Sequence, residues 1–227
     1  MNERRQASAH VMVESLDAPA LEPDDAHHLS KVLRLRDGET VTVTDGVGRW
    51  RTTKYVDGAL VPTSTVVEEA RRGPSLTVLF ALTKGDKPEV VVQKLAELGV
   101  DVVIPFRAER SVARWDDDKA ERQSERWRRV TREALMQSRS VRLTRVAEVQ
   151  PNLGAALAGV AAAGLALADP GGGVLDESVQ TVVVGPEGGF SEWERSLITR
   201  MVSLPGAILR AETAAIVAGA LLVDRHR

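Results

Sequence analysis

The 227-residue sequence contains no cysteine, which excludes disulfides, thiol chemistry and zinc sites with cysteine ligands. It also lacks an apolar run of the roughly 18 residues that a membrane-spanning helix needs. Its first residues, MNERRQASAH, lack the apolar segment of a secretory signal peptide. Cytoplasmic residence is therefore the default expectation.

A strong positive charge, the usual mark of a nucleic-acid-binding protein, is missing as well. The formal net charge is −2, so any binding of RNA requires a local concentration of positive charge. Residues 107–145 supply one, because they hold twelve Lys and Arg against seven Asp and Glu. This segment is either an RNA-facing surface or a solvated helix face.

Two common phosphate-binding motifs are absent. The sequence has no GxxxxGK[ST] segment and no GxGxxG segment after a strand. A nucleotide-phosphate enzyme built on a glycine loop would therefore lack its lysine and its metal ligands. The four histidines, His10, His27, His28 and His226, are distant in sequence from the motifs described next.

The most informative segment is residues 181–191, TVVVGPEGGFS. Its β-branched run predicts a buried parallel strand, and its proline and glycines predict a tight turn that can approach a ligand closely. Ser191 and Glu194 stand at capping-box spacing, so we expect a helix to begin after the loop. Open α/β sheets place ligand crevices where such strands end. Residues 204–214, LPGAILRAETA, repeat the pattern of small residues beside a few polar groups.

The remaining pattern predicts two domains, residues 1–70 and 71–227, with the boundary at EEARRGP. The first is β-rich, with strands expected at residues 10–14, 39–44, 48–55 and 61–67 and a helix at 29–35. The second alternates strands and helices, which predicts a parallel α/β sheet. We expect its strands at residues 76–82, 100–105, 143–149, 164–168 and 181–184, and helices at 89–98, 119–138, 151–163 and 214–223. Residues 169–173, DPGGG, are expected to be a flexible loop.

Five segments together resemble the SPOUT methyltransferases, specifically the ribosomal small-subunit methyltransferase E family: HHLSKVLRLRDGE, KGDKPEVVVQKLAELGV, EALMQS, GPEGGFS and ILRAETA. The resemblance implies S-adenosylmethionine-dependent methylation of N3 of a uridine in 16S ribosomal RNA. It also implies an α/β domain with a parallel sheet and a deep trefoil knot, and a small PUA-like, RNA-binding β-barrel domain before it. From the resemblance we further expect a homodimer that acts on small-subunit ribosomal RNA or on the assembled subunit. We expect no association with a membrane and no metal ion.

The resemblance also implies which residues bind S-adenosylmethionine. They belong to the two motif segments: Val184, Gly185, Pro186, Glu187, Gly188, Leu204, Pro205, Gly206, Ile208, Leu209, Arg210, Glu212, Thr213 and Ala214. Three residues depart from the family pattern, which has glycine at 205 and arginine at 207 and 140. Here these positions are Pro205, Ala207 and Ser140, and Arg139 or Arg142 is a possible substitute for the last arginine.

Uridine N3 carries a proton and becomes a good nucleophile when that proton is lost, so the site needs a base or a cation that favours the deprotonated ring. Arg210 is the expected cation and Glu133 the expected base. Arg210 has an alternative role, which is to pair with Glu212 or Glu187 and hold the loop.

Eight residues on or beside the family segments are expected to contact RNA: His28, Lys31, Arg34, Arg36, Lys84, Arg110, Gln137 and Arg139. Two alternatives stay open. One is a methyltransferase of the same fold with another RNA target, and the other is a non-catalytic RNA-binding protein.

Overall fold

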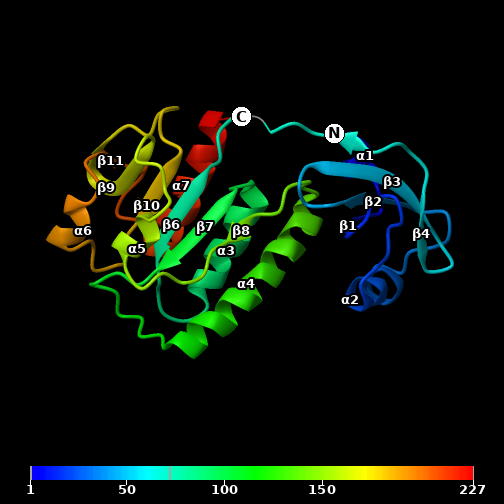
Figure 1. The fold of residues 1–227 in the computed structure, drawn as a ribbon, viewed down its shortest axis with the longest axis horizontal. Helices are drawn as coiled ribbons and strands as arrows, with labels where there is room; N and C mark the ends of the chain where they lie inside the picture. The colour runs from blue at the N-terminus through cyan, green and yellow to red at the C-terminus, as the bar shows by residue number, and fades with distance from the viewer. Residues whose placement is uncertain (1, 72, 227) are drawn as a thin grey trace. The chain divides into compact units, whose positions relative to one another are not determined.

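The computed structural model describes residues 2–71 and 73–226, and the chain divides into two compact units (Figure 1). One unit holds the chain up to residue 71 together with residues 132–143, and the other holds the rest. No helix in the described part of the chain is long and apolar enough to cross a membrane.

The first unit is built on a five-stranded sheet in the order β1-β2-β3-β4, with β5 paired to β3. Its strands are β1 (Ala9–Met12), β2 (Thr40–Thr44), β3 (Arg49–Val56), β4 (Ala59–Pro62) and β5 (Val67–Glu68). Its helices are α1 (Asn2–Gln6), α2 (Pro23–His27) and the π-helix η1 (His28–Val32). Pairing of β1 with β4, which would close the predicted barrel, is not seen among these strands. The predicted helix at 29–35 ends earlier, because the backbone turns left-handed at Arg34 (φ +54°).

Strand β2 is buried on both faces, although its alternating sequence predicted burial of one face. Val41 and Val43 lie in the apolar core, while Thr42 and Thr44 are also fully buried. The second face is covered by residues 132–143. There His10 lies between the Thr42 hydroxyl and the Ser140 carbonyl oxygen, at 2.8 Å from each. Burial, with the nearby Arg4 and Arg139 charges, lowers the pKa of His10 to about 4, against the opposing effect of the Ser140 carbonyl.

Residues 132–143 join this unit through specific polar contacts, which a division of the chain at residue 70 could not include. Arg132 forms a bidentate ion pair with buried Asp25, its Nη2 lying 2.6 Å from Oδ2. Arg142 donates to the carbonyl oxygens of Val47 and Glu69. The contacts of Arg142 also require Gly48, because a Cβ there would lie 2.4 Å from the guanidinium.

The second unit contains a six-stranded sheet in which every neighbouring pair is parallel, in the order β11-β9-β10-β6-β7-β8. Its strands are β6 (Thr77–Ala81), β7 (Val102–Phe106), β8 (Arg145–Val146), β9 (Leu165–Gly173), β10 (Thr181–Val184) and β11 (Met201–Val202). Its helices are α3 (Lys87–Leu98), α4 (Asp117–Ser138, shared with the first unit), α5 (Leu153–Leu157), α6 (Glu192–Ser196) and α7 (Ala211–His226).

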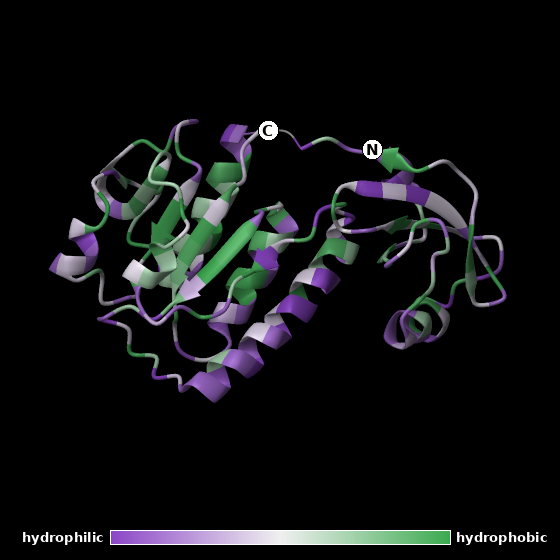
Figure 2. Ribbon diagram, viewed as in Figure 1, coloured by the Kyte–Doolittle hydropathy of each residue, from purple (hydrophilic) through white to green (hydrophobic). Residues whose placement is uncertain are grey.

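Apolar residues form a core on each face of this sheet, and the ribbon in Figure 2 is green along the central strands. One core contains Phe80, Trp127 and Leu222, and the other contains Leu79 and Phe190. The predicted buried strand at 181–184 is confirmed as β10, whose four residues are all buried. Helix α7 is likewise buried along its inner side against α3. A Cβ at Gly219 would lie 2.3 Å from Leu95 Cδ2, so only glycine permits this close packing.

Two predictions for the second unit were wrong. Residues 169–173 are not a flexible loop but belong to β9, whose pairing with β11 shifts between Met201 and Val202. Gly172 in this segment serves close packing, because a Cβ there would lie within 2.6 Å of the Val202 backbone. The helix expected at 151–163 ends at Leu157, shortly before the left-handed Gly159 (φ +86°).

Candidate active site

The carboxyl ends of the parallel strands meet at one edge of the second sheet, and the two motif segments meet there. Strand β10 lies beside β6 in the middle of the sheet. From β6 the chain proceeds to β7 and β8 on one side, while β10, β9 and β11 lie on the other. This reversal of strand order is where open α/β sheets form a ligand crevice. The loops at residues 82–86, 107–116 and 185–191 follow β6, β7 and β10 at this edge, and the start of α7 reaches it through the contact of Glu212 with Lys87.

The loop after β10 depends on its glycines for close contacts. A Cβ at Gly185 would lie 2.7 Å from the Phe190 ring, and one at Gly188 would lie 3.0 Å from the Arg110 carbonyl oxygen. Gly189 is left-handed (φ +70°), and its N–H donates to the Pro186 carbonyl oxygen at 2.9 Å. The turn predicted from the sequence is therefore confirmed, and its backbone lies against the loop that follows β7.

The predicted capping box at the start of α6 is confirmed, and its glutamate also holds a neighbouring loop. The Ser191 hydroxyl accepts from the Glu194 N–H, and Glu194 Oε2 accepts from the Ser191 N–H at 2.9 Å. The other oxygen, Oε1, accepts from the Glu109 N–H at 3.1 Å, and the Glu194 side chain is fully buried. Glu194 thus fastens the loop after β10 to the loop after β7.

The loop after β7 is also fastened to the end of β6. The Ser111 hydroxyl donates to the Leu82 carbonyl oxygen at 2.6 Å. Together with the hydrogen bonds of Glu194, this contact connects the loops after β6, β7 and β10 into one continuous surface, called the wall of loops below. Arg110, whose carbonyl oxygen lies against Gly188, is exposed.

Lys87, at the start of α3, brings the two motif segments together. Its Nζ lies 3.1 Å from Glu212 Oε1 in the first turn of α7 and 3.8 Å from Glu187 Oε1 in the loop after β10. Glu187 and Glu212 therefore both pair with Lys87, and the alternative role of Arg210 in holding the loop stays open. The sequence analysis singled out Lys84 and missed Lys87, although KGDK contains both. The sequence could have indicated Lys87 by its position, because it lies at the start of the helix that follows β6.

Burial works to raise the pKa of Glu212, but hydrogen bonds from its own N–H and from Lys87 outweigh it and lower that pKa. The nearby charges of Lys87 and Arg210 act in the same direction. Glu212 is therefore a carboxylate at neutral pH. Arg210 itself is exposed.

Two buried oxygens at this edge have no hydrogen-bond partner within the described residues: Thr83 Oγ1, in the loop after β6, and Glu212 Oε2. Thr83 is only 2% exposed. Buried polar atoms are almost always hydrogen-bonded, so a pair without partners fits a site whose ligand supplies polar groups. Hydroxyl and ammonium groups are suitable partners, because a carboxylate oxygen accepts hydrogen bonds and donates none.

The predicted RNA contacts are distributed over both units. His28, Lys31, Arg34 and Arg36 are all exposed on or just after η1. Gln137 is exposed in the first unit, while Lys84 and Arg110 are exposed in the second.

Two further predictions, the role of Arg139 or Arg142 as a substitute arginine and that of Glu133 as a base, concern residues of the first unit. Arg139 has a left-handed backbone (φ +57°), and its guanidinium donates to the Arg4 carbonyl oxygen. Arg139 and Arg142 therefore both hold backbone carbonyls of the first unit, which gives each a structural role. Glu133 is exposed in this unit, whereas Arg210 belongs to the other, so their joint action stays a prediction.

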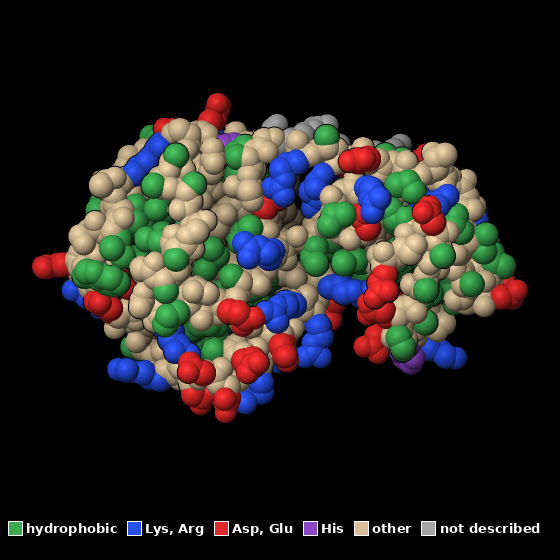
Figure 3. Space-filling model, in the orientation of Figure 1, with side chains coloured by type: hydrophobic (Ala, Val, Ile, Leu, Met, Phe, Trp, Pro, Cys, Tyr) green, Lys and Arg blue, Asp and Glu red, His purple; other side chains and the backbone are tan. Residues whose placement is uncertain are grey.

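Part of the positive charge in residues 107–145 is neutralised by ion pairs. Figure 3 shows acidic and basic side chains mixed over α4 at the lower centre of the view. Arg107 pairs with Asp117, and Arg126 and Arg128 pair with Glu89 and Glu148. The predicted positive segment is therefore a mixed surface over much of α4.

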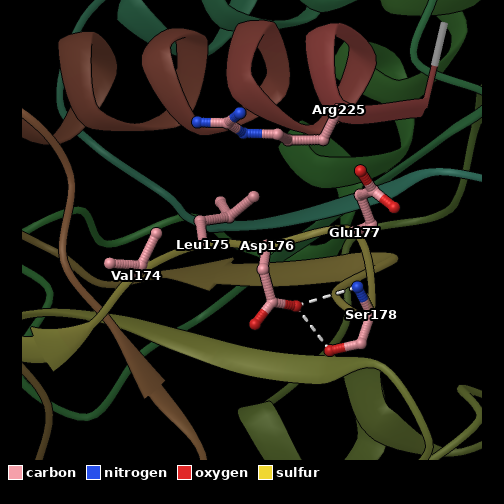
Figure 4. Close-up of a pocket in the computed structure, with 6 residues that line it drawn as sticks. All are labelled: Val174, Leu175, Asp176, Glu177, Ser178 and Arg225. Atoms are coloured by element: carbon pink, nitrogen blue, oxygen red, sulfur yellow. Dashed lines mark hydrogen bonds between the residues drawn. The ribbon is translucent and has the colours of Figure 1, made fainter.

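A surface cavity of about 510 Å³ lies elsewhere, at residues 174–178 and Arg225 (Figure 4). It is formed by the connection between β9 and β10 and by the last turn of α7, and none of the predicted site residues lines it. Asp176 in this cavity is held by Ser178 and Arg200, whose hydrogen bonds lower its pKa to about 2. No group of side chains suited to a metal ion was found in the described part of the chain.

Comparison with known proteins identifies the family of the chain. The RNA methyltransferase domain family matches residues 71–223, and the RNA methyltransferase PUA domain family matches residues 21–58. The ribosomal RNA small subunit methyltransferase E of Mycobacterium bovis is 32% identical, over 86% of this chain and 82% of its own length. The corresponding Synechocystis protein is 32% identical, over 85% of this chain and 68% of its own length.

Solved structures agree as well. A candidate methyltransferase of Legionella pneumophila, solved in complex with bound S-adenosylmethionine, superposes with a TM-score of 0.78. It is 27% identical, and the match covers 94% of this chain and 96% of that one. The predicted α/β SPOUT fold with an N-terminal PUA-like domain is confirmed. The chain belongs to the ribosomal RNA small subunit methyltransferase E family.

Proposed function

We propose that this protein transfers a methyl group from S-adenosylmethionine to N3 of a uridine in 16S ribosomal RNA. The observation that carries the proposal is the junction of residues 185–191 with the first turn of α7 at the switch point of the sheet, through Lys87. The two segments are those by which the sequence resembles the family. The small-subunit target is that of the relatives, whose names specify the small-subunit ribosomal RNA.

The residues proposed to hold S-adenosylmethionine are those predicted from the two motif segments, residues 184–188 and 204–214. When bound there, it supplies an activated methyl group on a positively charged sulfur. Backbone groups of the glycine loop can bind an adenine edge without a charged side chain. Thr83 and Glu212 offer polar oxygens that still need partners. Because most of these contacts are to backbone, the site tolerates Ala207 better than it tolerates Pro205.

The chemical problem at uridine N3 is its proton. Arg210 is proposed to favour the deprotonated ring by its positive charge, which the exposed position of the side chain leaves available to a large substrate. Glu133 is proposed as the base. Glu212 is a poor alternative, because Lys87 helps to keep its pKa low.

The RNA is proposed to contact cations of both units. His28, Lys31, Arg34 and Arg36 would contact phosphates in the first unit, and Lys84 and Arg110 would do so beside the site. The family resemblance further supports a homodimer, a deep trefoil knot in the second unit and residence in the cytoplasm, each of which stays a proposal.

Calorimetric titration of the purified protein with S-adenosylmethionine tests the proposal. The expected result is saturable binding at one site per chain. If free protein does not bind, the titration is repeated with small ribosomal subunits present, because RNA can complete the pocket. Failure in both conditions would contradict the proposed function and favour a non-catalytic RNA-binding protein.

A further inference from the structure

Lys87 occupies an unusual position among the ion pairs of the second unit, because its two acidic partners come from the two cofactor segments. Glu212 Oε1 lies 3.1 Å from Nζ and Glu187 Oε1 lies 3.8 Å away. Lys87 itself starts α3, directly after the loop that contains Thr83. One side chain thus contacts an acidic residue of each cofactor segment without belonging to either segment.

The Glu212 side chain is 17% exposed, and its two oxygens have different surroundings. Oε1 contacts Lys87, while Oε2 is buried and has no partner in the described residues. A carboxylate rotates freely about its last bond unless one oxygen is fixed. The Lys87 contact therefore decides which oxygen is left for a ligand, and in which direction it can accept a hydrogen bond.

We propose that Lys87 is a positioning residue for the methyl donor: it fixes Glu212 so that Oε2 accepts a hydrogen bond from a hydroxyl or ammonium group of S-adenosylmethionine, and it draws Glu187 and its loop onto the same carboxylate. This inference rests on the proposed function. It adds to that function a residue outside both motifs, and it assigns the unpartnered oxygen of Glu212 to the cofactor. Pre-organisation of this kind improves affinity because it removes the cost of ordering the loop during binding.

The decisive experiment compares the affinity for S-adenosylmethionine of Lys87→Met, which keeps the length of the side chain and removes its charge, with that of the wild type. Loss of one charge-assisted contact should weaken binding about tenfold. Lys87→Arg should restore most of the affinity, since it keeps a cation in reach of both carboxylates.

Lys94→Met is the matched control. Lys94 lies on the same helix, is 42% exposed where Lys87 is 40% exposed, and pairs with Glu97 at 2.8 Å. It does not touch either motif segment in any described contact. Both methionine variants should therefore change the melting temperature by similar small amounts, whereas Lys87→Met alone should change the affinity.

A double-mutant cycle tests whether Lys87 acts through Glu212. Glu212→Gln should weaken binding about as much as Lys87→Met, and the double variant should be little worse than either single variant. Should Lys87→Met fail to fold, Glu187→Gln and Glu212→Gln still report on the two contacts separately.

The possible failures are distinguishable. A wild-type chain that binds while Lys87→Met and Glu212→Gln bind equally well would overturn this inference and leave the proposed function intact. Additive losses in the double variant would show that Lys87 does not act through Glu212. A wild-type chain that fails to bind, even with small subunits present, would remove the proposed function and this inference together.

Discussion

Replacement of Glu194 by glutamine tests the wall of loops at the carboxyl edge of the sheet. The Glu194 carboxylate is fully buried and accepts from two backbone N–H groups, those of Ser191 and Glu109. A glutamine side chain has one acceptor oxygen, and its NH₂ group would face the second N–H donor. One backbone N–H group is therefore left buried without a partner in the variant.

The expected loss of stability follows from these contacts. An unsatisfied buried donor costs about 1–3 kcal/mol, and conversion of the remaining bond from charged to neutral costs about 1 kcal/mol more. Removal of a buried charge offsets part of this loss, so the free energy of unfolding should fall by about 2–3 kcal/mol. For a chain of this size the melting temperature should then fall by about 5–10 °C.

Scanning calorimetry measures this loss, with Glu192→Gln as the control. Glu192 is exposed in the same helix, so its replacement should lower the melting temperature only slightly. Because Glu194 also joins the loops at residues 185–191 and 107–116, Glu194→Gln should weaken binding of S-adenosylmethionine more than Glu192→Gln does. Equal melting temperatures for the two variants would refute the reasoning.

Three further predictions concern pH, catalysis and RNA. Because the pKa of His10 is about 4 in the folded protein and 6.5 ordinarily, the unfolded state binds more protons between these values. About 3 kcal/mol of stability should be lost as the pH falls from 6.5 to 4. Urea unfolding at several pH values measures this loss, and replacement of His10 by asparagine should reduce it. Arg210→Ala should lower the rate of methyl transfer far more than the affinity for S-adenosylmethionine, in single-turnover and calorimetric measurements; equal losses would mean that Arg210 only shapes its loop. Arg110→Ala and Arg34→Ala should each weaken RNA binding and reduce the slope of log affinity against log salt concentration by about 1, and an unchanged slope would remove that residue from the RNA-binding surface.

Local pattern was sufficient where one segment determines its own structure. The run at 181–184 was correctly predicted to be a buried strand, because it is short, β-branched and followed directly by glycine and proline. Ser191 and Glu194 form the capping box that their spacing predicted. The place expected for the ligand follows from the rule that ligands bind where parallel strands end, which depends only on the alternation of strands and helices, and ligand binding there stays a prediction.

Contacts between distant segments could not be predicted in this way. The burial of the second face of β2 comes from residues 132–143, about ninety positions later, and no local pattern indicates it. The glycines at residues 171–173 were interpreted as flexibility because a glycine run carries the same signal whether it allows motion or close packing. Gly172 serves packing against Val202.

The same limit explains Lys87. Within KGDK, the sequence does not distinguish a lysine that points to solvent from one that forms ion pairs with glutamates of distant segments. The distinction requires the packing of β10 and α7 beside β6. That packing brings Glu187 and Glu212, about 100 and 125 positions after Lys87, next to its side chain. The trefoil knot implied by the family resemblance stays a prediction.

The measurement that tests the central claim most directly is analysis of the methylated nucleoside. Small ribosomal subunits from a strain that lacks the corresponding modification are incubated with the protein and isotopically labelled S-adenosylmethionine, and the 16S ribosomal RNA is digested and separated by chromatography with mass detection. The account predicts one labelled nucleoside, 3-methyluridine, which disappears with Arg210→Ala. Label in another nucleoside, in another RNA, or in none would contradict the account.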